Sequence, residues 1–303
     1  MELGQFDPSL QPLLRRIPRV PVEKPWVRRL AAGVSKVMPG GRTPGVDRRV
    51  FREAGARVRV FRPAEPSGAG LLWIHGGGLI GGAASQDDWF CGETASSLGV
   101  TIVSVDYRLA PRHPYPAAID DCAAAFAWLR EKADAIGIDP ERLAIGGQSA
   151  GGGLAACLVQ RLTDQGTLVR AQWLFCPMLD DRTALDRSLD ALRHPVWDNT
   201  ANRAAWACYL GGAAAARAPY AAAARRTDVS GLPPTWIGFG DVELFAAENV
   251  GYARRLIQAG VPTEVDSVPG APHAFETWAF RVPLARALRQ RARSWLGAQL
   301  ASR

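Results

Sequence analysis

The sequence predicts an α/β protein: an eight-stranded, mostly parallel sheet flanked by helices and carrying a helical cap. Segments with strand composition alternate with segments of helical periodicity, which is the pattern of a parallel sheet with helices on its faces. The chain has 303 residues, of which 48% are hydrophobic and 21% charged, and this balance is typical of a globular enzyme. One long insertion without a strand pattern predicts the cap.

Eight short segments are the expected strands, and five longer segments carry apolar residues at helical spacing. The expected strands are residues 48–53, 57–62, 71–74, 101–105, 143–146, 171–175, 235–240 and 263–268. The expected helices are residues 87–97, 117–132, 150–163, 246–259 and a C-terminal helix from about residue 283.

Two regions fall outside this alternation. Residues 1–45 precede the first strand and have helical character interrupted by proline. Residues 183–230 lie between the sixth and seventh strands, and an insertion of this length in an α/β enzyme is usually a lid or cap. The catalytic domain is therefore expected to comprise residues 46–182 and 231–303.

Charge and cysteine usage exclude several classes of function. The net charge is +7, and residues 1–60 hold the excess with 13 basic and 5 acidic side chains. A charge run without a recognised binding fold is usually solvated surface, so no nucleic-acid partner is expected. No apolar run approaches the roughly 20 residues of a membrane span, and the N-terminus lacks a signal-peptide pattern. We expect a cytoplasmic protein without a membrane partner.

The five cysteines are an odd number and form no Cys-x-x-Cys pair. They lie mostly in apolar stretches, so we expect buried thiols rather than disulfides or metal ligands. No cluster of histidine, cysteine and carboxylate residues has the spacing of a metal site. We therefore expect neither a metal nor another cofactor.

The clearest chemical signal is Gly147-Gln148-Ser149-Ala150-Gly151, between an expected strand and an expected helix. Small residues beside Ser149 permit a sharp strand-to-helix turn that exposes its hydroxyl at the carboxyl end of the sheet. The helix directs its first N–H groups toward the same point. We interpret Ser149 as a nucleophile, with a plain turn as the alternative.

A second signal, His75-Gly76-Gly77-Gly78, follows the third expected strand. Successive glycines expose backbone N–H groups without obstruction, as an oxyanion hole requires. A flexible glycine turn is the alternative, but the pairing of this motif with a downstream Gly-x-Ser-x-Gly turn is much rarer than either motif alone. We expect the N–H groups of Gly77, Gly78 and Ala150 to be the donors, with His75 and Gly76 supporting the loop.

Two further motifs complete a recognisable set, and all four occur in the order that a known family has them. They are the glycine motif, Asp106-Tyr107-Arg108-Leu109-Ala110-Pro111 with His113-Pro114-Tyr115-Pro116-Ala117, the Ser149 turn, and Pro269-Gly270-Ala271-Pro272-His273-Ala274-Phe275. Across about residues 45–297 the chain resembles the bacterial hormone-sensitive-lipase-like esterases of the α/β-hydrolase superfamily. The resemblance implies an α/β-hydrolase fold, a cap built from residues 1–45 and 183–230, and a Ser/acid/His triad that hydrolyses carboxylic esters.

The chain departs from the family pattern at four positions. Gln148 replaces a common Asp or Glu, and Arg112 replaces a Glu. Leu79 replaces an aromatic residue, and Ala274 replaces a glycine. None of these changes removes a catalytic atom, but Gln148 and Arg112 could alter hydrogen bonding beneath the site.

The fold requires the triad to occur in the order Ser, acid, His, so the base must follow the last strands. The chain has four histidines. His75 belongs to the glycine motif, His113 lies in a proline-flanked loop and His194 lies in the insertion. His273 is therefore the expected general base.

Two carboxylates compete for the role of triad acid, because Asp241 and Glu243 both follow the seventh strand. In the family that the chain resembles, a Glu lies five residues after the triad acid. Glu248 lies five residues after Glu243, whereas Ala246 lies five residues after Asp241. The resemblance therefore favours Glu243. Asp241 stays the alternative. Asp180 and Asp181, after the sixth strand, are expected to be structural.

The sequence thus predicts a serine carboxylesterase that cleaves short- to medium-chain esters through Ser149, Glu243 and His273 and an acyl-enzyme intermediate. The same groups could cleave an amide, carbamate or thioester, and a non-catalytic small-ligand binder is a further alternative. A small-molecule ester is the expected partner, and a homodimer is left open.

Four aromatic side chains of the expected cap could close an apolar pocket over the site. They are Trp26, Trp197, Trp206 and Tyr209. Such a pocket suits small acyl esters better than emulsified triglyceride. Core packing within the cap is the alternative for each.

Overall fold

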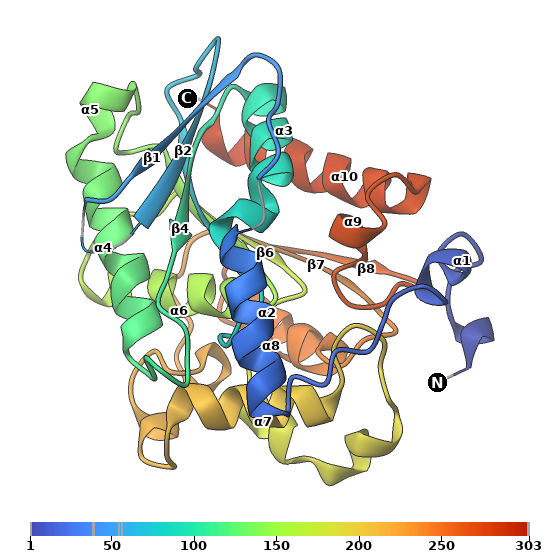
Figure 1. Ribbon diagram of the computed structural model, residues 1–303. Coiled ribbons are helices and arrows are strands. Elements are labelled where there is room, and N and C mark those ends of the chain that lie inside the picture. The colour runs from blue at the N-terminus through green and yellow to red at the C-terminus, as the bar shows by residue number, and fades with distance from the viewer. Residues whose placement is uncertain (1, 38–39, 54, 56, 302–303) are drawn as a thin grey trace.

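A computed structural model describes residues 2–37, 40–53, 55 and 57–301, and its centre is one eight-stranded sheet (Figure 1). The strand order is β1-β2-β4-β3-β5-β6-β7-β8. Strand β2 pairs antiparallel with β1 and β4, and all other pairs are parallel, so the predicted sheet is confirmed. The strands are β1 (Val46–Phe51), β2 (Arg57–Pro63), β3 (Gly70–Ile74), β4 (Thr101–Asp106), β5 (Leu143–Gln148), β6 (Ala171–Phe175), β7 (Thr235–Gly240) and β8 (Thr263–Val268).

The predicted bounds of the first strand were wrong by two residues at each end. The antiparallel register pairs Val46 with Pro63 and Phe51 with Val58, so β1 begins directly after the turn at Gly45 and ends at Phe51. Pairing with β2, which one segment's sequence does not reveal, sets these limits. Strand β5 is longer than predicted and runs to Gln148, the residue before Ser149.

Helices cover both faces of the sheet, with α3 and α10 on one face and α4, α6 and α8 on the other (Figure 1). All five predicted helices are confirmed, with the bounds α3 (Asp88–Leu98), α4 (Ala117–Glu131), α6 (Ala150–Asp164), α8 (Ala246–Gln258) and α10 (Pro283–Leu300). Two short helices were not predicted, α5 (Ala133–Ile136) and α9 (Phe275–Trp278).

The central strands β3, β5, β6 and β7 are buried along their whole length, as expected for parallel strands with helices on both faces. On the α3 and α10 face these strands carry four aromatic rings that form one cluster with Phe90 of α3. The four are Trp73, Trp173, Phe175 and Trp236. Because both faces are covered, the functional groups of the sheet gather at the carboxyl ends of its strands.

The N-terminal arm and the insertion are largely helical. The arm holds η1 (Leu3–Gln5), α1 (Gln11–Leu14) and α2 (Pro25–Val37), and Figure 1 shows α2 passing in front of the sheet. The described residues from 183 to 230 contain no strand, and their elements are the end of η3 (Asp181–Leu185), η4 (Arg187–Ala191), α7 (Asn199–Leu210), η5 (Ala215–Arg217) and η6 (Ala223–Arg225). Arg19 of the arm forms an ion pair with Asp198 of the insertion at 3.0 Å.

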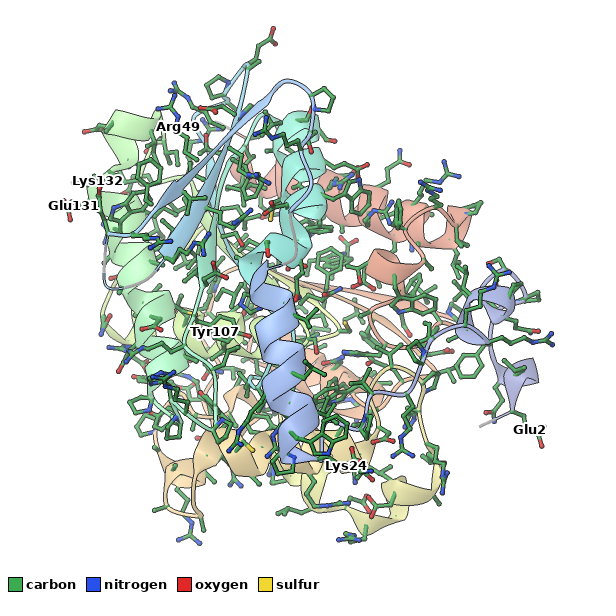
Figure 2. All side chains as sticks on the ribbon, viewed as in Figure 1. Glu2, Lys24, Arg49, Tyr107, Glu131 and Lys132 are labelled. Carbon is green, nitrogen blue, oxygen red and sulfur yellow. The ribbon has the colours of Figure 1, made fainter. Side chains whose placement is uncertain are left out.

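The cysteine thiols are free, and burial separates them into two groups. Cys91, Cys122, Cys157 and Cys176 are buried, while Cys208 is half-buried. Figure 2 shows the same contrast between interior and surface for other side chains, since Tyr107 lies inside the molecule while Lys132 projects from its edge.

Within the described part of the chain, no helix has both the length and the apolar character to cross a membrane.

A pair of buried carboxylates joins α3 to the sheet. Asp88 forms ion pairs with Arg59 and Arg48. The neighbouring Asp87 instead accepts a hydrogen bond from the Trp73 indole Nε1 at 2.7 Å. Burial raises the pKa of the Asp87 carboxyl to about 7, although the indole hydrogen bond opposes this shift.

The raised pKa of Asp87 makes protein stability depend on pH. The folded state binds the Asp87 proton more tightly than the unfolded state does. The stabilisation that this proton gives the folded state is therefore complete below about pH 4 and is lost as pH rises toward 7. Asp87→Asn keeps an acceptor for Trp73 but removes the titration. The free energy of unfolding in urea, taken as the variant minus the natural protein, should therefore rise by about 1.4 kcal/mol per pH unit across that range. An identical difference at pH 5 and pH 7.5 would contradict this.

Candidate active site

Ser149 occupies the sharp turn between β5 and α6. Its backbone has φ 55° and ψ −121°, a conformation that a non-glycine residue adopts only when its surroundings impose it. Close packing imposes it here, since a Cβ atom added to Gly151 would stand 2.0 Å from the carbonyl oxygen of Ile74. The turn holds the Ser149 side chain at the carboxyl end of the sheet, beside the first turn of α6.

Ser149, His273 and Glu243 form one hydrogen-bonded chain. Ser149 Oγ lies 2.9 Å from His273 Nε2, and His273 Nδ1 forms a short hydrogen bond with Glu243 Oε2. A carboxylate accepts the Nδ1 proton, which leaves Nε2 free to accept the serine proton. All three side chains are buried. Burial raises the pKa of Glu243, while interaction with His273 opposes the shift.

Asp241, the competing acid, lies apart from this chain. Its Oδ1 accepts a hydrogen bond from the backbone N–H of Gly270 at 2.7 Å, which ties the end of β7 to the loop that carries His273. Of the other acids considered, Asp180 caps η3 by accepting from the N–H of Arg182, and Asp181 pairs with Arg225. The structure therefore brings Glu243, and not Asp241, to the histidine.

The glycine motif forms a loop that approaches the Ser149 turn. A Cβ atom on Gly76 would stand 3.4 Å from Ser149 Cβ. Gly77 has φ +124°, and a Cβ there would collide with the Gly81 carbonyl oxygen at 2.2 Å, so only glycine fits. Among the described residues, the N–H groups of Gly77 and Gly78 donate to no protein acceptor. The N–H of Ala150, at the start of α6, is one of those that a helix leaves without an internal partner.

His75 and Tyr107 hold this loop from beneath. The rings stack with centroids 4.3 Å apart, and the Tyr107 hydroxyl donates to the His75 carbonyl oxygen at 3.0 Å. His75 Nδ1 lies 2.7 Å from the Gly76 carbonyl oxygen. Desolvation lowers the pKa of His75, so the ring is neutral near pH 7 and acts as a fixed hydrogen-bond donor.

Sequence reasoning missed one buried contact beneath the site. Gln148 Nε2 donates to Glu276 Oε1 at 2.5 Å, and both side chains are buried. Burial raises the pKa of Glu276, and the Gln148 hydrogen bond opposes the shift. The contact joins the residue before Ser149 to the short helix after His273. A carboxylate three residues after the histidine was the sequence signal that could have suggested it.

The four aromatic residues predicted to close a pocket behave differently from one another. Trp206 and Tyr209 are buried, and the Trp197 ring lies so close to Gly78 that a Cβ there would stand 2.2 Å from it. The prediction was wrong for Trp26, whose side chain is 64% exposed. Its face of α2 points to solvent, and helical periodicity alone does not reveal which face a neighbour covers.

Among the residues that the structure describes, no three side chains of histidine, cysteine, aspartate or glutamate gather in a group that could hold a metal ion.

Comparisons with known proteins agree with this fold. A family model described as the α/β-hydrolase fold matches residues 71–277. Esterase LipI of Mycobacterium tuberculosis is 36% identical over 221 residues, which cover 71% of this chain and 68% of LipI. Ethyl acetate hydrolase of Pseudomonas putida is 34% identical over 227 residues, which cover 72% of this chain and 70% of that enzyme. A solved structure of a bacterial heroin esterase superposes with a TM-score of 0.90 at 34% identity, covering 99% of both chains.

The fold and these relatives define the class of protein, which is a carboxylic ester hydrolase. The chain belongs to the α/β-hydrolase fold family, in its hormone-sensitive-lipase-like branch. The fold, the family and the enzyme class predicted from the sequence are therefore confirmed.

The Gln148–Glu276 contact gives a prediction about stability. Gln148→Glu would place two buried carboxylates together, and one of them must keep a proton. The folded state then binds that proton more tightly than the unfolded state, so stability should fall as pH rises, by about 1–3 kcal/mol. Thermal unfolding at pH 5.5 and 8.5 measures this effect.

The reciprocal substitution is the control for that experiment. Adding Glu276→Gln to Gln148→Glu exchanges the amide and the carboxylate, and should restore most of the loss at pH 8.5. A double variant as unstable as the single variant would show that the contact does not hold the two loops together.

Proposed function

We propose that Ser149, His273 and Glu243 are the catalytic triad of this carboxylesterase. The observation that carries the proposal is the buried hydrogen-bonded chain from Ser149 Oγ through His273 to Glu243. Its serine end lies beside the Gly76–Gly78 loop, whose N–H groups have no protein acceptor among the described residues. A nucleophile, a base, an orienting acid and unpaired donors at one point are the parts that acyl transfer needs.

In the acylation step, Ser149 Oγ attacks the ester carbonyl carbon while His273 Nε2 takes the serine proton. The carbonyl oxygen becomes an oxyanion, which the N–H groups of Gly77, Gly78 and Ala150 stabilise by hydrogen bonds. The tetrahedral intermediate then collapses. The bond to the leaving oxygen breaks, His273 gives its proton to that oxygen, the alcohol departs, and Ser149 is left acylated.

In the deacylation step, water replaces the alcohol. The water oxygen attacks the acyl carbon while His273 Nε2 takes a proton from that water. The same N–H groups stabilise the second oxyanion by hydrogen bonds. Collapse breaks the bond to Ser149 Oγ, which regains its proton from His273, and the carboxylic acid leaves. Glu243 keeps Nδ1 protonated and stabilises the imidazolium that forms in each step.

We further propose that residues 1–45 and 183–230 form a cap over this site. The arm meets the insertion through the Arg19–Asp198 ion pair. It also meets the histidine loop, since the N–H of Asp7 donates to the Gly270 carbonyl oxygen at 2.9 Å. Trp197 of the insertion lies against Gly78 of the glycine motif. The cap thus touches both loops that would hold the reacting groups.

The acyl group is proposed to lie beside Ala150, where the free space is small. A hollow of about 10 Å³ is bounded there by side chains that include Leu79, Trp206 and Tyr209. This is about the space of one water molecule, so a long chain would have to displace a buried aromatic ring. We infer a preference for short acyl groups.

The triad assignment predicts distinct effects for neighbouring carboxylates. Glu243→Gln should lower kcat by about 10⁴-fold, because the amide cannot stabilise the imidazolium, and Ser149→Ala should cost at least as much. Asp241→Asn keeps an acceptor for Gly270 and should change kcat by less than about tenfold. Hydrolysis of 4-nitrophenyl acetate measures all three. If the effects at Glu243 and Asp241 are exchanged, Asp241 is the acid.

The acyl-site assignment predicts a change of chain-length preference. Trp206→Ala should raise kcat/KM for 4-nitrophenyl octanoate relative to the acetate by about tenfold or more, because each added methylene gains favourable burial. Trp295→Ala, on α10, is the matched control and should leave this ratio unchanged. A Trp206→Ala profile identical to that of the natural protein would place the acyl group elsewhere.

A further inference from the structure

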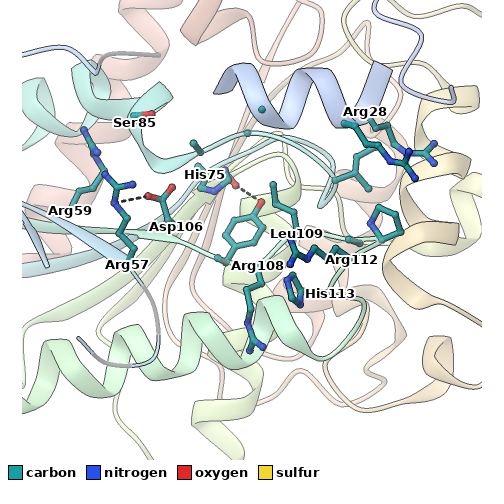
Figure 3. Close-up of a pocket in the computed structure, with 18 of the residues that line it drawn as sticks. Arg28, Arg57, Arg59, His75, Ser85, Asp106, Arg108, Leu109, Arg112 and His113 are labelled. Carbon is teal, nitrogen blue, oxygen red and sulfur yellow. Dashed lines mark hydrogen bonds and ion pairs between the residues drawn. The ribbon is translucent and has the colours of Figure 1, made fainter. Parts of the chain in front are cut away.

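A large cavity lies between α2 and the loop that follows β4 (Figure 3). Its volume is about 1140 Å³, enough for a small organic ester. His75, Ile80 and Gly82 contribute to its wall. The cavity and the proposed active site therefore share the loop that begins at His75.

The wall of this cavity is rich in arginine. The lining residues include six arginines, two histidines and Asp106. Three of the arginines have acidic partners, since Arg57 pairs with Asp106 at 3.6 Å, Arg59 with Asp88 and Arg108 with Asp121. Figure 3 shows Arg57, Arg59 and Asp106 together at one end of the cavity, while Arg108 points toward α4.

The other three arginines, Arg28, Arg29 and Arg112, have no acidic partner among the described residues. Arg28 Nη1 donates to the carbonyl oxygens of Val22 and Glu23, at 2.9 and 3.0 Å, while its buried Nε has no acceptor. Neither the Arg29 nor the Arg112 side chain forms an ion pair or hydrogen bond within the described part of the chain. In Figure 3, Arg28 lies beneath α2 on the same side of the cavity as Arg112. This end of the cavity carries uncompensated positive charge.

Apolar surface lies next to these charges. Ile80, Leu109 and Pro111 line the same cavity, so its wall combines an apolar patch with guanidinium groups. Guanidinium groups bind carboxylates and phosphates through paired, charge-assisted hydrogen bonds. A net charge of +7 would also attract an anion to the protein from a distance.

We propose that this cavity binds the anionic group of an ester substrate, so that the enzyme selects esters carrying a carboxylate or phosphate. Arg28, Arg29 and Arg112 are the specificity-determining residues, and the apolar patch receives the carbon chain that joins the anion to the ester. The inference rests on the proposed function of Ser149. It leaves two sources for the charge, which are the alcohol part of the ester and an acyl part that enters this cavity instead of the hollow beside Ala150.

Two pairs of esters separate these sources. The acyl pair is 4-nitrophenyl hydrogen adipate and its methyl ester, and the alcohol pair is 3-acetoxybenzoate and its methyl ester. The ratio of kcat/KM for the charged ester to that for its neutral partner is compared between the natural protein and the double variant Arg29→Gln, Arg112→Gln. The matched control is Arg254→Gln, an exposed arginine of α8 for which the structure shows no ion pair with a described residue.

For one of the two pairs, the ratio should fall by about tenfold or more in the double variant and should stay constant in the control. Raising the salt concentration from 50 to 500 mM should weaken the preference of the natural protein for the charged ester. Equal ratios in the natural protein and the double variant, for both pairs, would overturn the proposal.

A binding measurement keeps this test separate from that of the triad. Calorimetry on the natural protein and on the double variant measures the affinity for two anions without a hydrolysable bond, 6-oxoheptanoate in place of the adipate monoester and 3-methoxybenzoate in place of 3-acetoxybenzoate. If the two arginine substitutions lower the affinity for one of these anions about tenfold, the cavity site is supported, even if Ser149 proves not to be the nucleophile. Equal affinities with and without the arginines refute the site, even if the triad assignment is correct.

Discussion

The close approach of two backbone segments underlies this site. The carbonyl oxygen of Ile74, at the end of β3, occupies the place where a side chain on Gly151 would begin, since a Cβ there would stand 2.0 Å away. Neighbouring parallel strands end at the same edge of the sheet, and only a residue without a side chain allows α6 to start so close to β3. This approach sets the Ser149 turn beside the His75–Gly78 loop, and the proposed nucleophile beside the proposed oxyanion donors.

Polar contacts then fix the remaining loops around that point. Asp241 holds the Gly270 N–H, Glu276 holds Gln148, and Glu243 holds His273. Each contact joins elements distant in sequence, and at Glu276 and Glu243 burial disfavours the charge of the carboxylate unless a donor is present. The geometry of the histidine loop therefore depends on these donors as much as on apolar packing. Because the site is deeply buried, the oriented N–H groups and Glu243 would stabilise charge that develops during the reaction more strongly than water would.

The sheet and its main helices could be predicted because the spacing of apolar residues differs between strands and helices, and the order of the motifs indicated which carboxyl ends would meet. Contacts that depend on a distant partner could not. The Gln148–Glu276 hydrogen bond spans 128 residues of chain, and the start of β1 is fixed by its register with β2. Trp26 lies on an apolar face of α2 that the sequence could not distinguish from a buried one, and its side chain is exposed. The preference for Glu243 over Asp241 came from the family register, and the hydrogen bond between Glu243 and His273 agrees with it.

The most direct test of the central claim, that Ser149 is the nucleophile, is stoichiometric labelling with a 4-nitrophenyl alkylphosphonate. This reagent phosphonylates an activated serine and releases one 4-nitrophenolate. Trypsin would release Ser149 in the peptide of residues 143–161, between Arg142 and Arg161. If Ser149 is the nucleophile, each chain should release one 4-nitrophenolate and carry one phosphonyl group on that peptide, and ester hydrolysis should be lost in proportion to the label. Full activity with Ser149 labelled, or inactivation with the label on another residue, would contradict it.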